Sequence, residues 1–170
     1  QFGLVGSEMC IRDRIMSKVY LSIGSNKGNR SALINKAIDE IEKKIGIIIS
    51  RSSIYQSKSW GFDSNDFYNL CLLIETDIEP KSLLKDIKKV EKLMGREDID
   101  GTYSDRFIDI DILFYDNIVL DLKDLKIPHP KIEIRKFVLV PMLEIADDCV
   151  HPILNKTIKQ LDNDCDDQGI

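Results

Sequence analysis

Two kinds of hydrophobic spacing alternate along the chain. Short apolar runs, which are typical of β-strands, are separated by stretches in which apolar residues recur every three or four positions, as they do on one face of a helix. The strand pattern covers residues 19–23, 47–55, 69–76, 106–115 and 118–120. The helical pattern covers residues 29–45, 80–94 and 135–145.

Residues at the ends of the helical stretches support these boundaries. Asn29 and Ser31 are candidate N-caps for the first helix, and Gly46 supplies its end. Pro80 suits the first turn of the second helix, which Gly95 ends. Asp116 and Asn117 predict a hairpin turn between the strand that ends at residue 115 and residues 118–120. The core faces of the two helices would be formed by Leu33, Ala37, Ile38, Ile41 and Ile45, and by Leu83, Leu84, Ile87, Val90 and Met94.

The order of the elements predicts the fold class. Strands and helices alternate without strict β-α-β periodicity, and a hairpin is expected, so the pattern favours an α+β fold over a doubly wound parallel sheet. We expect a ferredoxin-like sandwich, in which helices pack on an antiparallel sheet.

Length and composition indicate one soluble globular domain. The chain has 170 residues, of which 43% are hydrophobic and 31% charged. Its net charge of −5 argues against a nucleic-acid partner. No apolar stretch approaches the length of a membrane-spanning segment, so no membrane partner is expected. The four cysteines are scattered without a C-x-x-C pair, so neither zinc nor a disulfide framework is expected, and we expect a cytoplasmic protein.

The two ends of the chain differ in composition from the middle. Residues 1–15 look like a non-native or disordered extension, since Met16 immediately precedes the first strand. We expect residues 16–160 to form the functional domain and residues 161–170 to form a polar tail that frays.

Asp109 and Asp111 are the strongest chemical signal. In a strand, residues i and i+2 point to the same face, so these carboxylates stand side by side, while Ile108, Ile110, Ile112 and Phe114 are expected to line the opposite, core-facing side. A divalent cation would remove the repulsion between them, and Mg²⁺ commonly combines one or two carboxylates with water and phosphate oxygens. A strand with one solvated face is the alternative for an isolated D-x-D pair.

Basic and aromatic residues near this strand extend the signal. The basic side chains that could meet phosphate are those of Arg96, Arg106, Lys131, Arg135 and Lys136, with His129 nearby. The turn over residues 24–30 lacks the G-K-[ST] ending of a P-loop, so a plain strand-to-helix turn is favoured there. Trp60, Phe67, Tyr68, Tyr103 and Phe137 could be core residues or could stack on a flat ligand, whose edge the amide of Asn69 would bind.

Several of these residues fall into one ordered set of motifs. The set comprises Tyr20-Leu-Ser-Ile-Gly-Ser-Asn26, Trp60-Gly61, Phe67-Tyr-Asn69, Glu91 with Gly95-Arg96, Arg106-x-x-Asp109-x-Asp111-Ile112, Ile127-Pro-His-Pro130 and Arg135-x-Phe137. Between about residues 19 and 158 the chain resembles the 6-hydroxymethyl-7,8-dihydropterin pyrophosphokinase family of folate biosynthesis. Residues 106–115 together with 127–137 are the most specific part of the resemblance.

The resemblance implies an activity and a set of site residues. It implies a monomer with small-molecule substrates that transfers diphosphate from ATP, its co-substrate, to the pterin and releases AMP. Asp109 and Asp111 would be catalytic and would hold two Mg²⁺ ions, and Arg96 and Arg106 would also be catalytic. Pterin binding is implied for Trp60, Phe67, Asn69 and Phe137. ATP binding is implied for Glu91, Arg96, Arg106, Ile112, His129 and Arg135.

Some positions depart from the family's best-known pattern, and two other functions stay open. Asp98 and Tyr103 stand where an arginine and a tryptophan are frequent, in a loop over residues 96–105 that we expect to act as a lid. The first alternative is a Mg²⁺-dependent phosphohydrolase that uses the same carboxylates. The second is a ferredoxin-like ligand-binding domain without catalysis.

Overall fold

The computed structural model describes residues 16–59, 65–95 and 107–170. The first half of the chain contains β1 (Ser17–Ser25), α1 (Arg30–Lys44), β2 (Ile47–Arg51), β3 (Tyr55–Ser57), β4 (Phe67–Thr76) and α2 (Pro80–Leu93). The second half contains β5 (Asp109–Tyr115), β6 (Leu120–Asp121), β7 (Lys126–Ile127), the 3₁₀ helix η1 (Ile132–Ile134), α3 (Lys136–Ala146) and α4 (Ile158–Asp164).

The main sheet has the strand order β2-β4-β1-β5, and β3 pairs with the first residues of β4, on the same edge of β4 as β2. Every pairing is antiparallel, and β1 lies in the interior of the sheet between β4 and β5. If β2 and the short β3 are counted as one interrupted strand, this order and the resulting β-α-β-β-α-β sequence are those of a split βαβ sandwich. The fold is α+β and ferredoxin-like, as the sequence predicted.

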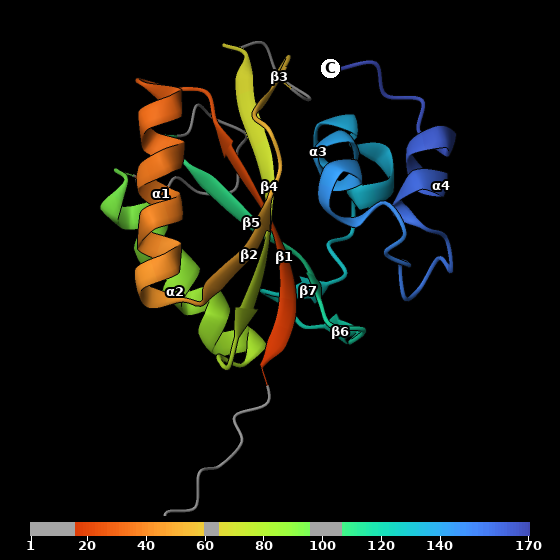
Figure 1. Cartoon of the computed structure of the whole chain (residues 1–170), viewed down its shortest axis with the longest axis horizontal. Helices are drawn as coiled ribbons and strands as arrows, with labels where there is room; N and C mark the ends of the chain where they lie inside the picture. The colour runs from red at the N-terminus through yellow and green to blue at the C-terminus, as the bar shows by residue number, and fades with distance from the viewer. Residues whose placement is uncertain (1–15, 60–64, 96–106) are drawn as a thin grey trace, which may run out of the picture.

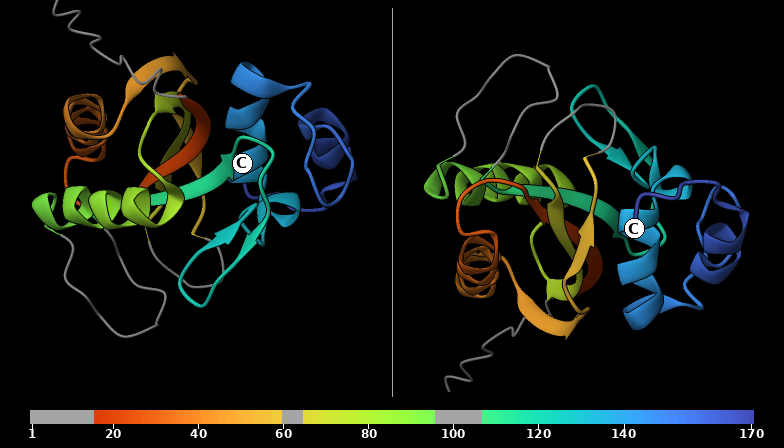
Figure 2. Two further views of the ribbon diagram at one scale, coloured as in Figure 1. Left: turned by 90° about the horizontal axis from the view of Figure 1, so that it is seen from below. Right: turned by 90° about the horizontal axis from the view of Figure 1, so that it is seen from above.

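Helices cover both faces of the sheet, as Figures 1 and 2 show. The helices α1 and α2 lie on one face, and α3 lies on the other, with α4 packed against the side of α3 that faces away from the sheet. The core under α1 and α2 is built from the predicted apolar stripes together with the residues of β1, β4 and β5 that point to that face. A second core joins α3 and α4 to the sheet through Cys71, Leu113 and Phe114.

The ends of α1 and α2 follow the local sequence. The side chain of Asn29 caps α1 by accepting a hydrogen bond from the Ala32 amide at 3.2 Å. Gly95 follows α2 with φ of +90°, a left-handed conformation that glycine adopts without a steric penalty. On α1 the predicted stripe packs in this core, with Leu33 only partly buried, but the prediction missed Ile34, which is fully buried.

The strand β5 contains an irregularity that the sequence did not reveal. Leu21 pairs with Ile112 and Tyr20 with Phe114, so Leu113 is an extra residue on β5. The bulge reverses the alternation beyond it. Ile108, Ile110 and Ile112 face α1 and α2 as predicted, but Phe114 lies in the core under α3, so its predicted placement was wrong.

Two predicted strand assignments also differ from the structure. Residues 47–55 form β2 and part of β3 rather than one strand, because the strand conformation is interrupted between Arg51 and Tyr55. In this interruption the buried Ser52 donates its amide to the Cys71 carbonyl at 3.0 Å. The turn at Asp116 and Asn117 is present, but β6 pairs with β7 and not with β5. The expected hairpin across that turn was therefore wrong.

The end of the chain packs on the domain instead of fraying as predicted. Residues 161–164 belong to α4, whose Thr157 and Gln160 form a capping box. Leu161 and Cys165 are buried in the core under α3. None of the helices in the described part of the chain is long and apolar enough to cross a membrane.

Candidate active site

Two rows of paired residues run across β4, β1 and β5 and place the predicted site residues on one face of the sheet. In the first row Gly24 pairs with Asn69 on one side and with Asp109 on the other. In the next row Ser22 pairs with Cys71 and with Asp111. Paired residues in an antiparallel sheet point to the same face, and Cys71 marks this face as the one that packs under α3.

Asp111 faces two residues that follow β7. Its Oδ2 lies 3.9 Å from Nε2 of His129 and 3.9 Å from an Nη atom of Arg135. The side chain of Asp111 is 39% exposed, whereas that of Arg135 is only 11% exposed. The sequence predicted that these three residues share a site, and the structure brings them together.

His129 is held in one orientation by the backbone. Its amide donates to the Leu113 carbonyl at 3.0 Å, at the bulge of β5, and its Nδ1 accepts from the Lys131 amide at 3.3 Å. Burial and the nearby positive charge of Arg135 lower the pKa of His129 to about 4. At neutral pH the ring is uncharged, and because Nδ1 accepts, its proton is on Nε2, on the side of Asp111.

Asn69 lies at the other end of the first row. It is 3% exposed, and its Nδ2 donates to Oγ of the buried Ser57 at 2.8 Å. Phe67, two residues earlier in β4, points to the same face and is partly buried. The side-chain oxygen of Asn69 is thereby oriented by Ser57, a residue that the sequence did not single out.

Phe137 approaches this face from the first turn of α3. Its ring is partly buried, and the guanidinium carbon of Arg135 lies 5.5 Å from its centroid, within range of a cation–π interaction. Arg135 thus connects the predicted aromatic residue to Asp111. The spacing Arg135-x-Phe137 sends the two side chains to the same region although only Phe137 belongs to the helix.

Glu91 and Ile112 lie on the side of α1 and α2. The Glu91 side chain is buried, and its Oε1 accepts a hydrogen bond from the Ile110 amide at 2.9 Å, which joins α2 to β5. The Ile112 side chain is 5% exposed and belongs to the core under α1 and α2. The role of both residues in ATP binding stays a prediction.

The turn after β1 contributes to the structure of β5. Ser25 is fully buried, and its Oγ donates to the Phe107 carbonyl at 2.6 Å. Gly28 has φ of +67° and faces the Phe107 ring, as does Gly95. This packing agrees with the plain strand-to-helix turn that the sequence favoured.

The remaining predicted site residues lie outside the described residues. They are Trp60, Arg96 and Arg106, together with Asp98, Tyr103 and the rest of the predicted lid. Within residues 16–59, 65–95 and 107–170 no three His, Cys, Asp or Glu side chains are grouped as a complete metal site. Two carboxylates on one face still fit Mg²⁺, which takes most of its ligands from water and substrate phosphates.

Comparison with known proteins identifies the family. Residues 20–147 match the family model of 7,8-dihydro-6-hydroxymethylpterin-pyrophosphokinase. The 2-amino-4-hydroxy-6-hydroxymethyldihydropteridine pyrophosphokinase of Aquifex aeolicus is 44% identical over 146 residues, which are 85% of this chain and 90% of that protein. The enzyme of the same name from Methylorubrum extorquens is 34% identical, over 91% of this chain and 98% of that protein.

Longer proteins also contain a similar domain. The folic acid synthesis protein fol1 of Pneumocystis carinii is 38% identical over 82% of this chain, but the match spans only 19% of that protein. The crystal structure of Plasmodium falciparum HPPK-DHPS shares the fold, with a TM-score of 0.70, 20% identity, and coverage of 88% of this chain and 44% of that chain. With this fold and these relatives, the chain belongs to the 7,8-dihydro-6-hydroxymethylpterin-pyrophosphokinase family and is an ATP-dependent pyrophosphokinase of folate biosynthesis.

Proposed function

We propose that the pterin and the triphosphate of ATP react in this chain over the row Asn69, Gly24 and Asp109. The observation that carries the proposal is the register of β1. Gly24 lies between the buried amide of Asn69 on β4 and the carboxylate of Asp109 on β5, and the carboxylate of Asp111 lies in the next row. A flat ligand bound by Asn69 would extend over Gly24, where no side chain blocks it, toward Asp109. Its hydroxymethyl group could then meet the diphosphate of ATP beside the carboxylates.

Asp109 and Asp111 would hold two Mg²⁺ ions. Their carboxylates are hard oxygen donors on one face, and the partial exposure of Asp111 leaves room for water and phosphate oxygens. When bound, Mg²⁺ would supply charge neutralisation for the phosphates and acidify the attacking alcohol.

The pterin subsite would combine stacking with hydrogen bonding. Phe67 from β4 and Phe137 from α3 would stack on the two faces of the ring, and Trp60 would lie near it. Asn69 would bind the edge of the ring, with its amide held by Ser57 in the orientation that the ligand meets. Preorganised polar groups of this kind give a mostly apolar site its specificity.

The phosphates of ATP would be met by the basic side chains. Arg135 and the Nε2–H of His129 lie beside Asp111, where they would donate to phosphate oxygens and help fix the triphosphate. Arg96 and Arg106 would bind ATP and act in catalysis. Glu91 and Ile112 would contribute to the nucleotide site from the side of α2, Ile112 through its backbone.

The reaction breaks the bond between the α- and β-phosphates of ATP and forms a bond from the β-phosphorus to the hydroxymethyl oxygen. The proton of the hydroxyl group is lost, and AMP leaves. For phosphoryl-type transfer the protein's contribution is positioning and charge stabilisation. We therefore assign no general base, and His129 would act as a hydrogen-bond donor.

We further propose that the protein acts as a cytoplasmic monomer on small molecules, with neither nucleic acid nor a membrane as partner. The net charge of −5 supports the nucleic-acid part of this proposal, because it opposes binding to a phosphate backbone.

The test is to incubate the protein with ATP, Mg²⁺ and 6-hydroxymethyl-7,8-dihydropterin and to detect AMP and the pterin diphosphate. Equimolar formation of both products, dependent on the pterin, supports the assignment. Nucleotide hydrolysis without pterin would instead identify a Mg²⁺-dependent phosphohydrolase. Ligand binding without turnover, and with affinity unchanged in Asp109→Asn, would identify a binding domain.

A further inference from the structure

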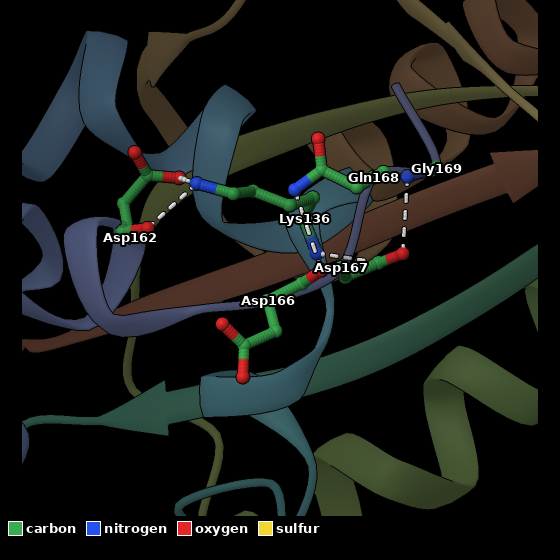
Figure 3. Close-up of polar contacts among 6 residues, drawn as sticks. All are labelled: Lys136, Asp162, Asp166, Asp167, Gln168 and Gly169. Atoms are coloured by element: carbon green, nitrogen blue, oxygen red, sulfur yellow. Dashed lines mark hydrogen bonds and ion pairs between the residues drawn. The ribbon is translucent and has the colours of Figure 1, made fainter.

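The last residues of the chain connect two segments that carry the proposed pterin site. One segment is the first turn of α3, where Phe137 lies, and the other is the end of β3, where Ser57 holds Asn69. These segments are far apart in the sequence. Residues 165–169, which we call the C-terminal strap, lie between them, and Figure 3 shows the contacts of this strap with α3.

Asp167 is the central residue of the strap. Its Oδ2 accepts a hydrogen bond from the backbone amide of Lys136 at 3.0 Å, and its Oδ1 accepts from the Gly169 amide at 3.0 Å. Lys136 is the first residue of α3, so its amide has no partner within the helix, and the side chain of the N-cap residue Arg135 does not cap it. Asp167 therefore caps α3 from a distant part of the chain.

A second pair of contacts fixes the same turn. The ammonium group of Lys136 donates to the Asp162 carbonyl at 2.6 Å and to Asp162 Oδ1 at 2.8 Å (Figure 3). Both groups are partly shielded from solvent, with side-chain exposures of 20% and 17%. Lys136 is thus held through its backbone and its side chain, and its chain neighbours are Arg135 and Phe137.

The other end of the strap reaches β3. The Gly169 carbonyl accepts a hydrogen bond from the Lys58 amide at 3.1 Å. Lys58 follows Ser57, whose hydroxyl accepts from Asn69 at 2.8 Å. A continuous path of bonds therefore runs from Phe137 through Lys136, Asp167 and Gly169 to Lys58, Ser57 and Asn69.

We infer that Asp167 is a positioning residue for pterin binding, which acts by fixing the Arg135–Phe137 turn of α3 relative to Asn69. This inference rests on the proposed function, since it assumes that Phe137 and Asn69 bind the pterin. Asp167 does not touch the substrate in this arrangement. Its carboxylate fixes the distance between the stacking ring and the hydrogen-bonding amide, and a negative charge at the start of α3 also complements the helix dipole.

The test compares Asp167→Ala with Asp167→Asn and Asp166→Ala. Asn keeps one accepting oxygen, and Asp166→Ala removes the same charge from the neighbouring residue, whose carboxylate points away from Lys136 (Figure 3). Pterin affinity is measured by calorimetry with a nonhydrolysable ATP analogue present, beside the affinity for the analogue alone, a thermal melt and the hydrogen exchange of the residue 136–139 amides.

Asp167→Ala should weaken pterin binding about fivefold, the effect of losing a typical helix cap, and should speed exchange at the Lys136 amide. Binding of the ATP analogue should change less than twofold, Asp167→Asn should restore part of the loss, and Asp166→Ala should match the wild type. Unchanged pterin affinity in Asp167→Ala would overturn the inference. A loss that Asp166→Ala shares, or that affects both ligands equally in step with the melting temperature, would also overturn it. If the wild-type protein itself did not bind pterin, the proposed function would fail first, and this result is distinct from every comparison between variants.

Discussion

A Cβ atom built on Gly24 would lie 3.1 Å from Oδ1 of Asn69 and 3.7 Å from Cδ1 of Phe67. Gly24 pairs with Asn69 in the register of β1 and β4, so the two residues are fixed opposite each other. The amide of Asn69 cannot turn away without losing its hydrogen bond to Ser57. Glycine at this position therefore leaves the proposed pterin site open, at the cost of a flexible residue inside a strand.

Gly24→Ala is expected to weaken pterin binding about tenfold, because the new methyl group displaces Asn69 and occupies space above the sheet. Affinity for an ATP analogue should change far less, since the methyl group is directed at Asn69 and Phe67. Calorimetric titration of both ligands measures the difference, and a thermal melt controls for folding. An alanine variant with wild-type pterin affinity would show that the ligand does not lie over Gly24.

Asp109→Asn and Asp111→Asn are expected to lower turnover by at least about 10²–10³-fold, since each removes charge that stabilises the transition state. The fold should be retained, and the stability of Asp109→Asn should hold or rise, because two like charges on one face of β5 repel each other. Asp111→Asn should gain less stability, since it also removes the negative charge that faces Arg135. Initial rates of AMP formation at several Mg²⁺ concentrations, beside thermal melts, give both quantities.

Asp39→Asn is the matched control for these variants, since Asp39 is exposed on α1, on the opposite side of the sheet. It should have wild-type turnover. Near-wild-type turnover in either β5 variant would exclude that carboxylate from the metal site.

Phe137→Ala is expected to reduce pterin affinity by about tenfold or more while changing ATP affinity little. The ring contributes apolar burial and a stacking interaction of about 0.5–1.5 kcal/mol beyond that burial. Phe67→Tyr, which keeps a ring face, is the control and should bind pterin nearly as well as the wild type. If Phe137 were only a core residue, its loss would lower the melting temperature and weaken both ligands together.

The parts of the fold that depend on local sequence were predicted well. The helix ends at Asn29, Pro80 and Gly95 follow from capping and backbone preferences, which act within a few residues. The shared face of Asp109 and Asp111 follows from the period of a strand. These features need no knowledge of which strand lies beside which.

The features that sequence reasoning missed depend on contacts between distant segments. The bulge at Leu113 is defined only by the pairing of β5 with β1, and it moves Phe114 to the other face. Ser57 gains its role because β3 pairs with β4, which brings it to Asn69. The C-terminal strap is polar in sequence, and it is held in place by the hydrogen bond between Asp167 and the amide of Lys136, about thirty residues earlier. For Gly24, the only sequence signal of its place beside Asn69 was its position directly after the apolar run of residues 19–23.

The environment of His151 allows a prediction of how the stability of the domain depends on pH. It is 4% exposed, its ring contacts Phe114 edge-on, and its Nδ1 accepts from the amides of Ile153 and Leu154, both at 3.2 Å. Burial lowers the pKa of His151, and the nearby negative charge of Glu133 offsets this only in part. Protonation at Nδ1 would remove the acceptor of both hydrogen bonds and place an N–H group opposite the two amide N–H groups.

Because the folded pKa is lower than that of the unfolded chain, the unfolded state binds more protons once the pH falls below about 6.5. The free energy of unfolding should therefore decrease from pH 7 to pH 5, with a slope from this residue of at most about 1.4 kcal/mol per pH unit.

His151→Asn keeps an oxygen that can accept from the amides two and three residues on, as in an Asx turn, but it does not titrate. Urea unfolding of both proteins at pH 8, 7, 6 and 5 should give a shallower pH dependence for the variant. His129, whose pKa is also lowered, is present in both proteins, so the difference between the two slopes isolates His151. Parallel slopes would mean that the ring of His151 is not held neutral by its environment.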